Sequence, residues 1–192
     1  ANSTFNSIVA LHLIIFGTMT IGGIYLGHDI IVLVYGQEFE AAGLVFQILA
    51  LLILIASITN VTGHALEAAG EQKKVMGIAM RATGANFLMN LFLIPMLGMI
   101  GAAITTVLTE LLTIIIQVRM ARKRDDLKIR MSYLVPGFVY LAVIAVLFAG
   151  LSPLEKYLES LMPAIIALTL SIFAGMLVAV GLLFCSRRYV LA

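Results

Sequence analysis

The chain has 192 residues, of which 62% are apolar and only 11% are charged, and its formal net charge is +2. This composition lies well outside that of soluble globular domains and predicts a membrane protein. We expect the lipid bilayer to be a partner of the chain, and we expect no nucleic-acid partner.

A bilayer core about 30 Å thick requires ~20 apolar residues per helix. Six segments meet this requirement, at residues 5–26, 41–65, 75–94, 97–118, 133–151 and 161–184. They lack the alternation that is typical of barrel strands, so the predicted fold class is all-α, a polytopic bundle of about six transmembrane helices.

The first segment has no basic flank and no cleavage signal, which argues against a signal peptide. We expect it to continue from something upstream.

The basic residues are distributed unevenly over the connections. Ten of the twelve fall on one side of the membrane if the six helices alternate in direction. These ten are Lys73, Lys74, Arg119, Arg122, Lys123, Arg124, Lys128, Arg130, Arg187 and Arg188. By the positive-inside rule, both termini are expected to be cytoplasmic in a cell inner (plasma) membrane.

Residues 27–39, "GHDIIVLVYGQEF", follow the first predicted helix. Their apolar part is too short to span a membrane and is bounded by Gly27 and Gly36. We interpret this stretch as a short interfacial or re-entrant piece on the outer face.

Two predicted helices carry polar stripes at helical spacing. The stripe on the second helix consists of Ser57, Asn60, His64, Glu67 and Glu71. The stripe on the fourth consists of Thr106, Glu110, Thr113 and Gln117. A lone histidine such as His64 is either a packing residue or a proton carrier.

Residues 90–103 contain helix breakers and small residues. The third helix is expected to end near Ile94, because a proline disfavours the α conformation of the residue before it. Pro95 and Gly98 are expected to form a tight outer turn, and Gly101 should let the third and fourth helices approach closely. Asn86 and Asn90, one turn apart, are interpreted as links between helices, with substrate contact as the alternative.

Arg81 and Glu110 are the ionisable residues predicted to lie deepest in the membrane. Comparable depth on neighbouring helices permits an ion pair, which would reduce the cost of burying either charge. The alternative is that Arg81 extends to the inner interface and serves only as an anchor. The candidate residues for a substrate path are Arg81, Glu110, His64, Asn60, Thr106 and Thr113.

Motifs of the common hydrolases, metalloproteases and nucleotide-binding enzymes are absent from the sequence. The three histidines do not have metal-ligand spacing, and Cys185 is the only cysteine. Asp125 and Asp126 could hold a metal-bound sugar nucleotide, but a solvated basic loop explains them better. We therefore expect no enzyme activity, no metal ion and no cofactor.

The stretch from "IIVLVYGQEF" through "ALEAAGEQKK" and "NFLMNLFLIPMLGMIGAAITT" to "TELL" resembles the C-terminal part of polysaccharide (O-antigen type) flippases. These belong to the multidrug, oligosaccharidyl-lipid and polysaccharide exporter superfamily. The resemblance covers about eighty residues. It implies that residues 1–192 form a single transmembrane helical domain that lacks the N-terminal lobe of such a transporter.

The resemblance also implies a function. The substrate would be a polyprenyl-pyrophosphate-linked oligosaccharide, Arg81 would face its pyrophosphate, and Glu110 would be structural. The partners would be the missing lobe or other polysaccharide assembly proteins. Two other hypotheses are a standalone six-helix subunit with a structural or assembly role, and a cation-coupled multidrug exporter of the same superfamily.

Overall fold

The computed structural model describes residues 2–124 and 127–159, and all regular structure in them is helical. The elements are α1 (Asn2–Tyr35), η1 (Gln37–Phe39), α2 (Glu40–Ala68), α3 (Gln72–Leu97), α4 (Met99–Ala121) and α5 (Met131–Glu159). All five α-helices are long and apolar enough to cross a membrane. The all-α prediction is confirmed for these residues, and the predicted segment 161–184 lies outside them.

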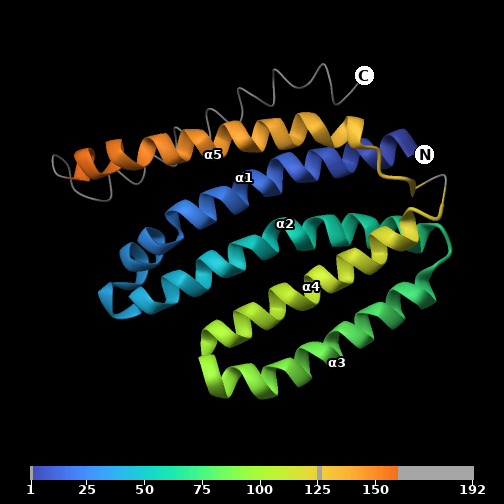
Figure 1. Ribbon diagram of the computed structural model, residues 1–192, viewed down its shortest axis with the longest axis horizontal. Coiled ribbons are helices and arrows are strands. Elements are labelled where there is room, and N and C mark those ends of the chain that lie inside the picture. Colours follow the sequence, from blue (N-terminus) through green and yellow to red (C-terminus); the bar gives the residue numbers. More distant parts are fainter. Residues whose placement is uncertain (1, 125–126, 160–192) are drawn as a thin grey trace.

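The five helices lie side by side in the order α5, α1, α2, α4, α3, as Figure 1 shows. The extensive contacts join neighbours in this row, and α3 packs mainly on α4 rather than on α2. A row one helix deep leaves many large apolar side chains exposed on its faces. Lipid, or protein outside the described residues, must cover them.

The α1–α2 hairpin corrects the interpretation of residues 27–39. α1 continues through Gly27 to Tyr35, so there is no separate re-entrant piece in this part of the chain. Gly27 lies within the helix, and its missing side chain makes room for Phe46 of α2, as Gly23 makes room for Ala50. The chain turns only at Gly36, whose φ of 94° favours glycine.

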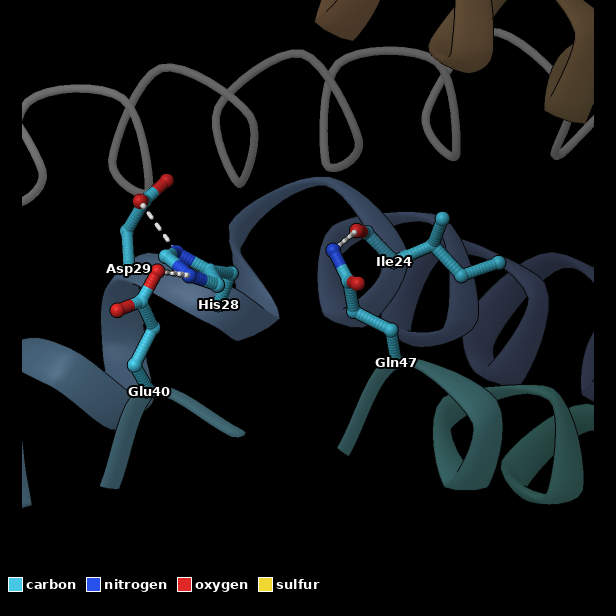
Figure 2. A network of polar contacts seen from close by, with 5 residues as sticks. All are labelled: Ile24, His28, Asp29, Glu40 and Gln47. Carbon is cyan, nitrogen blue, oxygen red and sulfur yellow. Dashed lines mark hydrogen bonds and ion pairs between the residues drawn. The ribbon is translucent and has the colours of Figure 1, made fainter. Parts of the chain in front are cut away.

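Polar contacts hold the turn end of this hairpin (Figure 2). The His28 ring lies between two carboxylates, 3.4 Å from Asp29 Oδ1 and 3.6 Å from Glu40 Oε1. Further from the turn, the Gln47 amide donates a 2.8 Å hydrogen bond to the Ile24 carbonyl. These contacts set the register between α1 and α2.

The α3–α4 hairpin also differs in detail from the prediction. α3 includes Pro95 and ends at Leu97, not near Ile94, so the turn consists of Gly98 alone. Gly98 has φ 58° and ψ −135°, a backbone conformation that is allowed for glycine and that would be strained for other residues. The Gly98 N–H still donates to the Ile94 carbonyl at 2.8 Å, so the helix closes after the proline.

The opposite end of the row contains three segments that are distant in sequence. The buried Asn6 side chain binds the backbone of the α4–α5 connection, accepting from Arg130 N–H and donating to the Lys128 carbonyl. Glu71, in the α2–α3 turn, contacts Lys74 at 2.7 Å and Arg124 at 3.7 Å. The hydrogen bond from Lys74 lowers the pKa of the Glu71 carboxyl, against an opposing effect of desolvation.

Candidate functional site

A groove of about 310 Å³ opens between α2, α3 and α4. The α2 side consists mainly of Asn60, Gly63, His64 and Glu67, and the α4 side of Glu110, Thr113 and Gln117. The α3 wall is formed by Val75, Ala79, Ala82 and Thr83. Three residues of each polar stripe therefore line one groove.

The groove begins at the end of the row where the basic connections lie and extends along the helices. Glu67 is next to the last residue of α2, whereas Glu110 is eleven residues before the end of α4, about 16 Å along the axis. Polar side chains at that depth in a membrane-spanning helix require water, a partner or a substrate. The groove can supply water to them from one membrane surface.

The groove is acidic because two carboxylates, those of Glu67 and Glu110, line it beside His64. His64 Nδ1 lies 3.1 Å from Glu67 Oε2, and both side chains are accessible. Glu110 is half-buried and has no ion-pair partner among the residues that the structure describes. No lysine or arginine of the described ranges lines this groove, so its described lining suits a cation or a neutral polar group better than an anion.

Gln117 is the most deeply buried of the polar residues that line the groove. It is 5% exposed, and its Oε1 has no hydrogen-bond partner in the part of the chain that the structure describes. The amide packs on Gly63, where an added Cβ would lie 3.4 Å from Nε2. Sequence reasoning placed Gln117 in a stripe but did not choose it as a site residue, and it missed Gly63 because a glycine carries no polar signal.

Arg81 lies outside the groove, on the exposed side of α3. It follows Ala79, which lines the groove, by two residues, so it lies about 160° away around the helix. The ion pair with Glu110 that equal depth permitted is not formed, because Arg81 faces away from α4. Within the described residues the guanidinium of Arg81 has no partner.

The candidate residues therefore separate into groups. Asn60, His64, Glu110 and Thr113 share the groove, whereas Arg81 does not. Thr106 is not part of the lining either, and its hydroxyl donates to the Ala102 carbonyl at 2.9 Å. The hydroxyl is thus bonded to the backbone of its own helix, as is common for threonine in apolar helices.

Asn86 and Asn90 lie in the contact between α3 and α4. The Asn86 amide donates to the Thr109 hydroxyl at 3.2 Å, and the Thr105 hydroxyl donates to Asn90 Oδ1 at 2.6 Å. Asn90 Nδ2 donates to Asn86 Oδ1 at 2.8 Å, which joins the two links. This chain of hydrogen bonds holds α3 against α4.

We expect Asn90→Ala to lower the free energy of unfolding by about 1 kcal/mol, because it removes two hydrogen bonds in an apolar setting. The measurement is unfolding of the purified chain in mixed micelles with increasing dodecyl sulfate. Asn60→Ala is the control, since Asn60 is exposed and makes no side-chain hydrogen bond in the described region. A loss at Asn60 equal to that at Asn90 would refute the assigned role.

Comparison of the chain with protein-family models, with curated proteins and with solved structures found no match.

Proposed function

We propose that this chain is the membrane-spanning C-terminal segment of a flippase that moves a polyprenyl-pyrophosphate-linked oligosaccharide across the membrane in cell-surface polysaccharide biosynthesis. The multi-pass helical architecture is compatible with this role. The exposed Arg81 is the observation that carries the proposal.

Arg81 is the only lysine or arginine of the described helices that lies more than one turn from a helix end. It is nine residues after the start of α3, about 13 Å along the axis. A guanidinium that faces hydrocarbon at this depth is costly, so an anionic or aqueous neighbour is required. A pyrophosphate suits it, because the planar guanidinium donates two parallel hydrogen bonds to phosphate oxygens.

The acidic groove favours a second candidate function. Two carboxylates that line a polar path would attract a cation, which fits a cation-coupled multidrug exporter. Arg81 and the groove lie on opposite sides of α3, so the two candidate functions depend on different residues of the chain. A transport assay can therefore separate them.

The test is transport by the full-length protein in vesicles, with two fluorescent substrates. One is a short-chain polyprenyl-pyrophosphate-linked sugar and the other is a lipophilic dye cation. We expect transfer of the sugar lipid to the opposite leaflet, measured as fluorescence protected from an impermeant quencher. Movement of the dye alone would favour the exporter, and movement of neither would refute both proposals.

The proposed orientation places both termini in the cytoplasm. The N-terminal part of α1, the α2–α3 turn and the α4–α5 connection lie at one end of the row. The basic residues of those connections are therefore together in space, whereas Asp29, Glu38 and Glu40 lie at the other end. The positive-inside rule assigns the basic end to the cytoplasm.

Cysteine labelling tests this orientation. In a Cys185→Ser background, which has no other cysteine, we expect an impermeant maleimide to label Glu38→Cys in intact cells. Lys123→Cys should react only after the membrane is permeabilised. Reaction of both positions from the same side would be incompatible with the orientation.

A further inference from the structure

A second surface feature lies where α4 ends and α5 begins. A pocket of about 730 Å³ there has three basic residues in its lining, Arg122, Lys128 and Arg130, beside apolar residues that include Ile129 and Met131. A groove of about 270 Å³ shares Arg122 and adds Arg119, Ile114 and Ile115. Neither lining contains an acidic residue among those that the structure describes, and the described part of the joint surface is cationic at one end and apolar at the other.

The arginines of this surface are available to a ligand. Arg119, Arg122 and Arg130 are exposed, and no ion pair occupies their guanidinium groups within the described residues. Arg124, two residues after Arg122, contrasts with them because it contacts Glu71 at 3.7 Å. Within the described ranges, Arg124 thus makes an internal ion pair, whereas Arg119, Arg122 and Arg130 make none.

The connection that carries the pocket is held in place. Asn6, with 0% of its surface exposed, binds the backbone on both sides of residue 129, at 2.9 Å to the Lys128 carbonyl and 2.7 Å to Arg130 N–H. Leu127 is buried in the core at this end of the row, and Ile129 packs against it. Arg130 and the end of α4 therefore have defined relative positions before any ligand binds.

The position of this surface selects the kind of ligand. Arg119 and Arg122 belong to the end of α4, at the level where a membrane-spanning helix meets lipid headgroups. Ile115 and Val118 lie on the face of α4 that leads from Arg122 into the membrane, at helical spacings of three and four residues. Basic pockets at this level are suited to anionic headgroups.

We propose that this surface binds an anionic phospholipid, with the headgroup phosphate at Arg122 and Arg130 and an acyl chain along Ile115 and Val118. The inference requires only that the helices span a membrane, and it is independent of the transported substrate. The same phosphate chemistry could be supplied by a soluble phosphate ester. The apolar strip below the arginines is the reason to choose a lipid.

The test uses the absence of tryptophan from the chain. Met131 lines the pocket and is 62% exposed, so Met131→Trp places a single fluorophore there. The full chain is reconstituted in phosphatidylcholine, and quenching by brominated phosphatidylglycerol is compared with quenching by brominated phosphatidylcholine. We expect a preference for the anionic lipid of about fivefold or more, since each basic residue near a headgroup contributes roughly that factor.

Matched variants identify the source of the preference. Arg122→Gln with Arg130→Gln should reduce it at least about fivefold, whereas Arg122→Lys with Arg130→Lys should keep most of it. Lys73→Gln with Lys123→Gln removes equal charge at the same end of the protein but outside both linings, and it should have little effect. Equal quenching by the two lipids, or an equal loss in the control variant, would overturn the proposal.

A competition distinguishes a lipid from a soluble phosphate ester. Millimolar glycerol phosphate should not relieve the quenching by brominated phosphatidylglycerol, because it has no acyl chain for the apolar strip. Full relief would show a phosphate site rather than a lipid site, and it would also overturn the proposal.

Discussion

Gly101→Ala should lower the stability of the folded chain by ~3 kcal/mol, or prevent folding. Gly101 is buried at the start of α4, and an added Cβ would collide with the carbonyl group of Leu93 on α3. The atoms in its way belong to the backbone, so no side-chain rotation can relieve the contact. The hairpin would have to open, and the hydrogen bonds between α3 and α4 would lengthen with it.

The measurement is the yield of monodisperse protein after detergent extraction, followed by unfolding in dodecyl sulfate. Gly84→Ala is the matched control, because Gly84 is also helical but has nothing within 4 Å of an added Cβ. Alanine there should be neutral or stabilise by up to about 1 kcal/mol, owing to its higher helix propensity. Equal stability of the two variants would refute the close approach at Gly101.

Arg81→Ala should abolish flipping by the full-length protein while its expression stays near normal. The Arg81 side chain is exposed and makes no ion pair within the described residues, so its loss should have little effect on packing. A pyrophosphate without a cation in a low-dielectric path costs several kcal/mol, which would reduce the rate by at least two orders of magnitude. Arg81→Lys should retain part of the rate, because lysine keeps the charge without the two-pronged geometry.

Met80→Ala is the control for a general disturbance of this surface, since Met80 precedes Arg81 and is 68% exposed. It should flip at close to the normal rate. Normal flipping by Arg81→Ala would remove Arg81 from the substrate path. Loss of expression, with normal flipping per folded molecule, would assign Arg81 a structural role.

Hydrophobicity along the chain predicted the fold class and most helix positions, because a bilayer imposes nearly the same length on every span. It failed at Gly27, where a glycine was interpreted as a boundary. In the structure, Gly23 and Gly27 form a small-residue face on which α2 packs closely. A glycine that ends a helix and one that accommodates a neighbour are indistinguishable without knowledge of that neighbour.

The candidate site was predictable only within single helices. Helical spacing correctly grouped Asn60 with His64 and Glu110 with Thr113, and the structure places both pairs in one groove. The order of helices was not predictable, and α4 lies between α2 and α3. Equal depth therefore suggested that Arg81 could meet Glu110, but depth does not determine the direction of a side chain around its helix.

We propose that Arg81 acts on an anionic substrate and not as a partner of Glu110. Flipping of a polyprenyl-pyrophosphate-linked sugar by the double variant Arg81→Gln with Glu110→Gln tests it most directly, with each single variant beside it. Because the two side chains lie on different sides of α3, the double variant should be as inactive as Arg81→Gln alone. Transport restored to the normal rate in the double variant would contradict the claim.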